Sequence, residues 1–428
     1  MRVLFLINFY PPFELGGQEK SCKQVVEGLH QRGHSTLVLT SDSGVDKRTW
    51  SKEDGVLREL RLEMDLTPLR HSLNFFTQRK AREKENIEVF ERVLNEFRPD
   101  VIFVWGMWNL PRSLPRYVED RCRGRTLFRF ATYWPTLPSQ HVFYWRKPGR
   151  KWYSQILKKI LAGVALRMLA EKNGQIPLTF SNSMCVSQAT KDELLRLGVP
   201  IENARVIHTG LDAGQFLANV RGERERNSER ISLLYAGRLE DTKGLEVAIE
   251  AVGRLVHKFG LKQVHFDIVG SGAEEYVEQL RKLARERGVD EYVSFLGRVP
   301  YEDMGDVMQA HDILLVPSTW PEPFARVLLE GMAAGMLVIA SNVGGSGEIV
   351  EDGVNGLLIR ANDAVDLAEK LALVVREEKL RLNLSRAGQA TVAQNFTIEH
   401  MLDEIESFLL EIVGEVTREN RSSKEIVA

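Results

Sequence analysis

Short apolar runs of strand length alternate with segments of helical periodicity along most of this chain, and this alternation restricts the fold more than any other feature of the sequence. The runs lie at 3–7, 35–40, 100–104 and 126–130 in the first half, and at 231–236, 264–269, 292–295, 313–316, 337–340 and 356–359 in the second. Strands that alternate with helices form parallel sheets with helices packed on both faces. We therefore predict an α/β protein.

The length of the chain predicts at least two domains, because 428 residues exceed what one hydrophobic core usually supports. Residues 221–230 are charged or polar with no apolar residue, as expected of a solvated linker or loop. Strand-like sequence at 205–208 precedes this stretch, and we assign it to the second domain. The predicted domains are 1–205 and 206–396, and 414–428 are expected to form a flexible tail.

Charge is distributed unevenly, although the whole chain carries only −2. Residues 1–200 contain 32 Lys and Arg and 21 Asp and Glu, a net of +11, which leaves 25 and 38 in the remainder, a net of −13. The basic half is suited to an anionic surface, but a drift in composition along the chain would produce the same asymmetry.

The cysteines and the apolar segments bear on the compartment. Cys22, Cys122 and Cys185 lie far apart without the spacing of metal ligands, which is typical of reduced thiols. The apolar run at the start is too short for a signal peptide, and no stretch approaches the ~18–20 apolar residues that span a bilayer. We expect a cytoplasmic protein, with peripheral attachment to the inner face of a membrane as an option.

A cationic loop follows the strand at 231–236. Arg238 and Lys243 lie between the end of that strand at Gly237 and a helix that begins near Gly244. A strand-loop-helix turn directs backbone N–H groups and the helix dipole toward an anion, and the two cations would add a guanidinium fork and a point charge for a diphosphate. The alternative is a pair of exposed surface cations.

A second loop, after the strand at 313–316, carries two glutamates. Prolines on both sides of Glu322 restrict the backbone that positions it, and Glu330 lies more than a turn inside the following helix. These carboxylates are placed to accept hydrogen bonds from two hydroxyl-bearing parts of one ligand. Alternatively, Glu322 caps a helix and Glu330 lies on a solvated helix face.

Two glycine-rich turns give weaker signals. Gly344 and Gly345 follow the strand at 337–340 and permit close approach of a ligand to the backbone. Gly270 and Gly272 resemble the start of a dinucleotide-binding fingerprint, but Glu275 occupies the position of its third glycine. This departure counts against a dehydrogenase.

Taken together in one order, these motifs resemble those of the retaining glycosyltransferases of family 4, the group 1 sugar transferases. The motifs are Gly-Arg-Leu-x3-Lys-Gly from Gly237, Val-Gly-Ser-Gly from Val269, Phe-Leu-Gly from Phe295, Glu-Pro-Phe-x5-Glu from Glu322, and a Gly-Gly-x2-Glu-Ile-Val segment from Gly344. The resemblance implies the GT-B fold, in which two Rossmann-like domains face each other across a cleft. It also implies that a C-terminal helix, here 397–413, crosses back to the N-terminal domain.

The same resemblance implies roles for individual residues. Arg238 and Lys243 would hold the donor diphosphate, Glu330 the ribose and Glu322 the transferred sugar, with Arg238, Lys243 and Glu322 taken as catalytic. No metal or other cofactor is implied, and the sequence has no Asp-x-Asp element suited to a metal–diphosphate bridge. The other residues implied to bind the donor are Gly17, Arg298, Val299, Phe324, Val327, Leu328, Gly344 and Gly345.

One position departs from the family pattern. Many members end an N-domain strand with a histidine that contacts the donor sugar, and Ala131 occupies that position here, in the run Phe-Ala-Thr-Tyr-Trp-Pro. Either other groups of the N-domain, such as Tyr133 or backbone carbonyls, replace the histidine, or the choice of substrate is altered or the enzyme is weakened. His141 lies nearby in sequence, but nothing in the sequence indicates that it substitutes.

Residues 146–170 combine basic charge with an apolar stripe. Six Lys and Arg lie between 146 and 159 among aromatic residues, and Ile156, Ile160, Val164 and Met168 recur every four residues. Such a helix is suited to an anionic membrane and would help to reach a lipid-linked acceptor. The alternative is a core helix, because packing requires the same spacing.

We therefore predict a metal-independent retaining glycosyltransferase that moves a sugar from a nucleoside diphosphate donor to a glycan or lipid-linked acceptor, with no nucleic-acid partner. A non-catalytic sugar-nucleotide-binding protein and a nucleotide-sugar epimerase on the same scaffold are the alternatives. The sequence does not identify the sugar, the base, the acceptor or the oligomeric state.

Overall fold

The computed structural model describes residues 1–14, 16–43, 55–66, 71–147, 152–172, 178–217 and 230–427. The predicted linker at 221–230 therefore lies outside the described residues, except for Arg230. The chain folds into two compact units. The N-terminal unit contains Met1–Val186, Thr190–Ile207 and Leu402–Ala428, and the C-terminal unit contains Ser187–Ala189 and His208–Met401.

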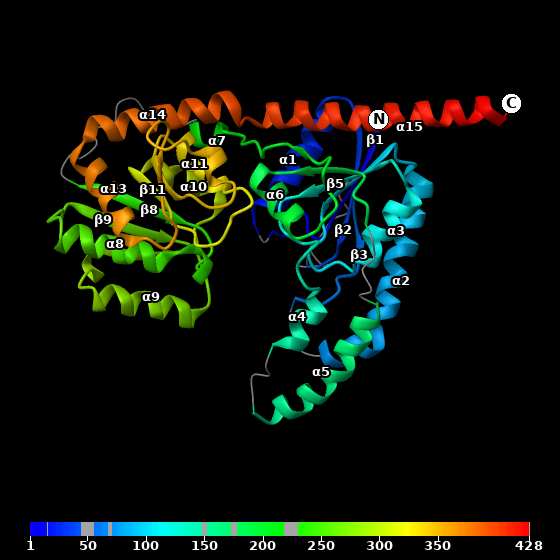
Figure 1. Cartoon of the computed structure of the whole chain (residues 1–428), viewed down its shortest axis with the longest axis horizontal. Coiled ribbons are helices and arrows are strands. Elements are labelled where there is room, and N and C mark those ends of the chain that lie inside the picture. Colours follow the sequence, from blue (N-terminus) through cyan, green and yellow to red (C-terminus); the bar gives the residue numbers. More distant parts are fainter. Residues whose placement is uncertain are drawn as a thin grey trace. The chain divides into compact units, whose positions relative to one another are not determined.

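The N-terminal unit is built on a seven-stranded sheet in which every pairing is parallel and the strand order is β3-β2-β1-β4-β5-β6-β7 (Figure 1). The strands are β1 (Arg2–Ile7), β2 (Ser35–Ser41), β3 (Val56–Leu60), β4 (Val101–Gly106), β5 (Thr126–Phe130), β6 (Asn182–Cys185) and β7 (Arg205–Val206). The helices are α1 (Gly17–Gln31), α2 (His71–Phe97), α3 (Ser113–Arg121), α4 (Gln140–Arg146), α5 (Trp152–Lys172) and α6 (Gln188–Arg196).

The C-terminal unit is built on a six-stranded parallel sheet with the order β10-β9-β8-β11-β12-β13. Its strands are β8 (Ile231–Ala236), β9 (Val264–Val269), β10 (Val293–Gly297), β11 (Ile313–Val316), β12 (Leu337–Ser341) and β13 (Leu357–Ile359). Its α-helices are α7 (Gly214–Leu217), α8 (Leu245–His257), α9 (Glu274–Glu286), α10 (Met304–Gln309), α11 (Arg326–Ala333), α12 (Ser346–Ile349), α13 (Ala364–Arg376) and α14 (Glu378–Asn395). Short 3-10 turns lie at Asp241–Lys243, Asp290–Tyr292 and Tyr301–Asp303.

Helices cover both faces of the C-terminal sheet, as buried parallel strands require. One core joins the sheet to α8, α9 and α13, through residues such as Leu245, Leu280 and Leu367. The other joins it to α10, α11 and α14, through residues such as Met308, Leu328 and Val392. The prediction of an α/β protein with parallel sheets is confirmed, and the ten strands expected from sequence are present.

The predictions missed β3 and β6 and misassigned β7. The sequences of β3 and β6, Val-Leu-Arg-Glu-Leu and Asn-Ser-Met-Cys, mix polar and apolar residues and so lack a continuous apolar run. Strand β7 was expected in the second domain, but it pairs with β6 in the sheet of the N-terminal unit.

A long helix, α15 (Ile398–Val427), closes the chain. Its first residues belong to the C-terminal unit and those from Leu402 onward to the N-terminal unit. Within the N-terminal unit, Glu406 accepts a hydrogen bond from Arg32 at 2.7 Å and contacts His34 at 2.7 Å. The helix continues through 414–427, where the sequence analysis expected a flexible tail.

Two further observations concern the cysteines and the length of the helices. Cys22, Cys122 and Cys185 are free and buried. Among the described helices, none combines the length and the apolar character needed to cross a bilayer.

Candidate functional site

The C-terminal sheet has a switch point between β8 and β11. The chain leaves β8 toward β9 on one side and leaves β11 toward β12 on the other. Ligands of open α/β sheets bind at such a point, outside the carboxyl ends of the strands. The two loops that begin there are 237–244 and 317–325, which carry the residues predicted to hold the donor.

The loop after β8 is fixed by a side chain of β8 and by the backbone of the loop after β11. Buried Tyr235 donates its hydroxyl hydrogen to the backbone oxygen of Arg238 at 2.6 Å. Gly244 has φ 68°, and a Cβ atom there would lie 2.0 Å from the backbone oxygen of Pro317. Only glycine fits this approach, so the two loops pack backbone against backbone.

Lys243 and Glu322, predicted as separate ligands of phosphate and sugar, contact each other in the structure. Lys243 Nζ pairs with Glu322 Oε1, and their side chains are only 18% and 16% exposed. Ser318 donates its hydroxyl to the same Glu322 oxygen at 3.0 Å. This carboxylate is therefore fixed by two partners at the switch point.

Arg238 is not part of this contact. Its Nη1 bonds Glu240 Oε1 at 2.6 Å, and its side chain is 66% exposed. It lies two residues after the end of β8, at the same carboxyl edge of the sheet as Lys243. Both predicted phosphate-binding cations thus have a carboxylate partner in the structure.

The predicted glycine turn after β12 supports the backbone of Glu322. Gly344 has φ 55°, and a Cβ atom at this position would lie 2.1 Å from the backbone oxygen of Glu322. The N–H of Gly345 donates to that same oxygen at 2.8 Å. The turn that sequence analysis assigned to ligand approach therefore packs directly against the loop of Glu322.

Glu330 lies on α11 and is half-buried. The Tyr301 hydroxyl donates to Glu330 Oε1 at 3.2 Å, and burial, together with the Glu330 charge, raises the pKa of Tyr301 above its usual range. At the start of α11, the N–H groups of Arg326 and Leu328 donate to backbone oxygens, whereas the described residues offer no acceptor to the N–H of Val327. That amide remains available to an anion.

The remaining predicted donor ligands are dispersed. Arg298 and Val299 follow β10, with Arg298 exposed and Val299 half-buried. Phe324 is half-buried and stacks on His208, with ring centroids 5.5 Å apart. Gly17, the first residue of α1, belongs to the N-terminal unit.

Glu348 serves the protein rather than a ligand. Its carboxylate accepts hydrogen bonds from the backbone of Gln188 and Ala189, both at 2.8 Å, and contacts His208 Nε2 at 2.9 Å. Burial alone would raise the pKa of Glu348, but the bonds from His208, Ala189 and Gln188 outweigh it and lower the pKa.

In the N-terminal unit, Ala131 directly follows β5. His141 is not an exposed substitute for the missing histidine. Its side chain on α4 is 2% exposed and packs edge-on against the ring of Phe75, with ring centroids 4.9 Å apart. Tyr133 is 5% exposed.

Sequence reasoning missed Ser318 and Tyr301, the hydroxyls that bond Glu322 and Glu330. Ser318 had a usable signal, because it is the first hydroxyl after β11. Tyr301 had none, because it meets Glu330 only through the fold.

Comparisons with known proteins point to glycosyltransferases. Residues 218–391 match the family model described as glycosyl transferases group 1. An uncharacterized glycosyltransferase of Methanocaldococcus jannaschii is 26% identical over 94% of this chain and 96% of its own length. Glycogen synthase of Mycobacterium tuberculosis is 26% identical over 92% of this chain and 91% of its own. The structure of Anabaena HepE in complex with UDP-glucose superposes with a TM-score of 0.67 at 21% identity, over 96% of this chain and all of that one.

The fold and these matches agree with the motifs at the switch point. The chain has the GT-B fold of two parallel-sheet Rossmann-like units, it carries a group 1 glycosyltransferase domain, and it is an enzyme that transfers sugars.

Proposed function

We propose that the protein transfers a sugar, with retention of anomeric configuration and without a metal, from a nucleoside diphosphate sugar to a glycan or lipid-linked acceptor. Glu322 would contact the transferred sugar, Glu330 the ribose, and Arg238 and Lys243 the diphosphate. The observation that carries this proposal is the Lys243–Glu322–Ser318 contact at the switch point of the C-terminal sheet.

Loss of a nucleoside diphosphate from the sugar builds negative charge on the leaving phosphate. Lys243 is largely buried, so its charge acts with less screening than a surface lysine would. The free Val327 amide at the start of α11 adds a fixed dipole directed at an anion. Groups that are already in place stabilise the transition state more than the ground state, because they need no reorganisation during the reaction.

Turnover of UDP-glucose by Lys243→Met and Glu322→Gln variants tests the assignment, since a structural relative has been solved with this donor. Removal of one charge-stabilising donor typically costs about 10²–10³-fold in kcat. Lys370→Met is the matched control, because Lys370 pairs with Asp352 at 2.8 Å in the same unit, away from the switch point. Equal turnover of Lys243→Met and Lys370→Met would show that the site is wrongly assigned.

The acceptor side of the proposal includes contact with an anionic membrane through 146–170. Of the predicted stripe, Ile160 and Val164 are 65% and 52% exposed on α5, while Ala165 and Leu169 pack against α4 and α2. The stripe therefore faces solvent at these positions instead of packing as a core helix would require. Exposed basic residues accompany it at Arg146, Lys147, Lys159 and Arg167.

Residues 148–151 lie outside the described part of the chain, and the side chain of Ile156 is not described. On α4, Phe143 adds a further apolar group that is 55% exposed. Figure 1 shows α4 and α5 projecting beyond the sheet of the N-terminal unit. Apolar groups flanked by basic ones are suited to an anionic bilayer.

Flotation with vesicles tests this contact. Wild-type protein should float with phosphatidylglycerol vesicles at low salt and less with phosphatidylcholine, and the double variant Ile160→Gln, Val164→Gln should float less. Leu373→Gln is the control, because Leu373 is 46% exposed in the other unit. If the double variant floats as well as this control, α5 does not contact the membrane.

A further inference from the structure

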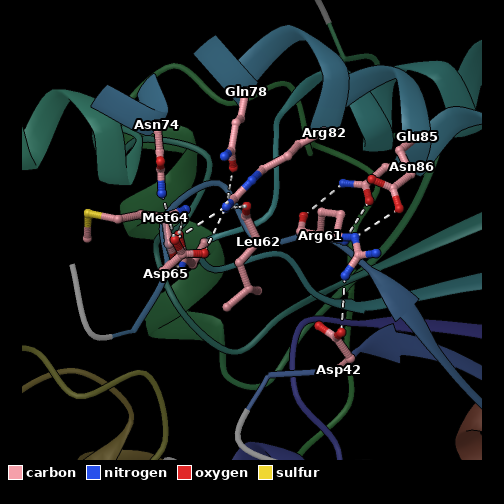
Figure 2. A network of polar contacts seen from close by, with 11 residues as sticks. Asp42, Arg61, Leu62, Met64, Asp65, Asn74, Gln78, Arg82, Glu85 and Asn86 are labelled. Carbon is pink, nitrogen blue, oxygen red and sulfur yellow. Dashed lines mark hydrogen bonds and ion pairs between the residues drawn. The ribbon is translucent and has the colours of Figure 1, made fainter. Parts of the chain in front are cut away.

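The N-terminal unit contains a rigid loop at the carboxyl end of β3. On one side, Arg82 of α2 donates to the backbone oxygen of Leu62 at 3.2 Å and pairs with Asp65 at 2.8 Å (Figure 2). Asn86 accepts from the backbone N–H of Arg61 at 2.7 Å and donates to its backbone oxygen at 2.9 Å. Helix α2 therefore fixes the loop at both ends.

The loop is held from the other side by Asn109, which follows β4 and has φ 57°. Its side chain accepts from the N–H of Met64 at 3.0 Å and donates to the Met64 oxygen at 2.7 Å. Its backbone oxygen accepts from the N–H of Glu63 at 2.8 Å. The backbone of Glu63 is thus already ordered without a ligand, which lowers the entropic cost of binding.

The side chain of Glu63 faces a cavity of about 40 Å³. At ~10–15 Å³ for each, this volume holds about three water molecules or one polar group of a larger ligand. The cavity lies beyond the ends of β3, β4 and β5, the edge of the sheet where ligands of such folds bind. Its lining is Glu63, Met107, Trp108, Asn109, Leu110, Arg112, Trp134, Leu137, Pro138, Ser139 and Gln140.

Two charged groups line this cavity without meeting. The Glu63 carboxylate accepts backbone hydrogen bonds from Gln140, at 2.8 Å to Oε2, and from His141. Arg112 Nη2 donates to the backbone oxygens of Trp134, at 3.0 Å, and Leu137. Within the described chain, no ion pair joins Glu63 to Arg112, and Nε and Nη1 of Arg112 have no hydrogen-bond acceptor. Burial raises the pKa of Glu63 to about 7, against the backbone bonds from Gln140 and His141 and the charge of Arg112, and burial lowers the pKa of Arg112.

The chemistry of a ligand that reaches both charged groups follows from this pair. A group that bonds both residues must donate to the Glu63 carboxylate and accept from the Arg112 guanidinium. A hydroxyl does both, whereas an anion is repelled by Glu63 and an ammonium by Arg112. Desolvated charged groups gain most from such bonds.

The rim of the cavity is apolar. Trp108 is 38% exposed with its ring 5.9 Å from that of Phe9, and Leu137 is 40% exposed. An exposed indole face beside a polar cavity suits a ligand with C–H faces as well as hydroxyls. Sugars have this combination.

We propose that this cavity binds one hydroxyl of a neutral sugar unit whose ring stacks on Trp108, and that this unit belongs to the acceptor. The acceptor role rests on the proposed function. Glu63 and Arg112 then determine specificity by requiring a neutral hydroxyl at one position of the acceptor sugar.

Binding of methyl α-D-glucoside, methyl α-D-mannoside and methyl β-D-galactoside to the full-length protein, followed by tryptophan fluorescence up to 100 mM, tests the inference. At least one glycoside should bind saturably, and Glu63→Gln and Trp108→Ala should each raise its Kd about tenfold or more. Glu59→Gln is the matched control, because Glu59 lies on β3, just before the loop that carries Glu63, and pairs with exposed Arg92 at 2.5 Å. Glu59→Gln should leave the Kd unchanged.

Hydrolysis of UDP-glucose, measured on the same samples, separates the two proposals. Glu63→Gln should retain the hydrolysis rate, because Glu63 has no role in holding the donor. Absence of saturable binding by all three glycosides, or equal Kd values for Glu63→Gln and Glu59→Gln, would overturn the inference even where donor hydrolysis is intact. A wild type that hydrolyses UDP-glucose no faster than Lys243→Met does would instead count against the proposed donor site.

Discussion

The close packing of Gly344 against the Glu322 loop predicts an unusually damaging glycine-to-alanine change. An alanine at φ 55° adopts the left-handed region, which costs about 1–2 kcal/mol for a residue with a Cβ atom. Its Cβ atom would also lie 2.1 Å from the Glu322 backbone oxygen, and relief of such overpacking costs a further ~1–3 kcal/mol. We therefore expect Gly344→Ala to destabilise the C-terminal unit by about 2–5 kcal/mol.

Gly353 provides the matched control. It has φ 76°, and no atom lies within 4 Å of the position its Cβ would take, so Gly353→Ala carries only the conformational cost. For a unit of this size, 1 kcal/mol shifts the unfolding midpoint by about 2–4 °C. Gly353→Ala should therefore lower the midpoint by about 2–8 °C, and Gly344→Ala by a further ~2–12 °C.

Thermal unfolding followed by circular dichroism, with and without UDP, provides the measurement. Because the alanine displaces the loop that carries Glu322, Gly344→Ala should also lower kcat/KM for UDP-glucose, whereas Gly353→Ala should not. Equal midpoints for the two variants would refute the reasoning, because the close approach to the Glu322 backbone distinguishes Gly344 from Gly353.

Three further predictions concern charge and burial. On the proposed donor site, Glu240→Gln should tighten binding of the donor nucleotide, probed with UDP, up to about fivefold at low salt and hardly at all at high salt. The reason is that an exposed pair such as Arg238–Glu240 contributes about 0.2–1 kcal/mol. Isothermal titration at two salt concentrations measures this, and weaker binding would contradict it. Because the pKa of Glu348 is lowered in the folded protein, its ionised carboxylate stabilises the fold above the ordinary carboxyl pKa. This stabilisation is lost as the pH falls through the lowered pKa. The unfolding midpoint of Glu348→Gln should therefore depend less on pH between pH 6 and 3 than that of the wild type. Burial raises the pKa of Cys185 to about 12, so its thiol should resist iodoacetamide at pH 8 in the native protein and react in urea, as peptide mass spectrometry would show.

The fold was predictable from sequence because its signals are local. Buried strands such as β4 and β11 are continuous apolar runs, and the loops at the switch point follow strands that are mostly apolar. Strand β7 was misassigned because two residues are too few to show a hydrophobic periodicity. Only its pairing with β6 assigns it to the N-terminal sheet. The exposure of Ile160 was left open for a similar reason, since a stripe with helical spacing does not reveal whether a partner covers it.

The candidate site was predictable in its residues but not in its contacts. The motifs place Lys243 and Glu322 on separate loops, 79 positions apart, and nothing local indicates that they pair. The cavity of the N-terminal unit was missed entirely. Glu63 and Arg112 belong to no motif, and their proximity depends on the alignment of β3 and β4 across two intervening strands.

The pairing of both candidate cations with carboxylates has a consequence for how a donor would bind. A diphosphate that engages Lys243 must compete with Glu322, so the net gain is smaller than the contact alone would give. A free diphosphate would leave the Glu322 carboxylate with only the Ser318 hydroxyl as a partner in a largely buried position. A nucleotide sugar carries phosphate oxygens for Lys243 together with hydroxyls that can donate to Glu322. On the proposed assignment, the intact donor therefore provides hydrogen-bond partners for both Lys243 and Glu322 once their contact is broken. The Lys243–Glu322 pair then favours binding of the nucleotide sugar over binding of the nucleoside diphosphate that remains after transfer.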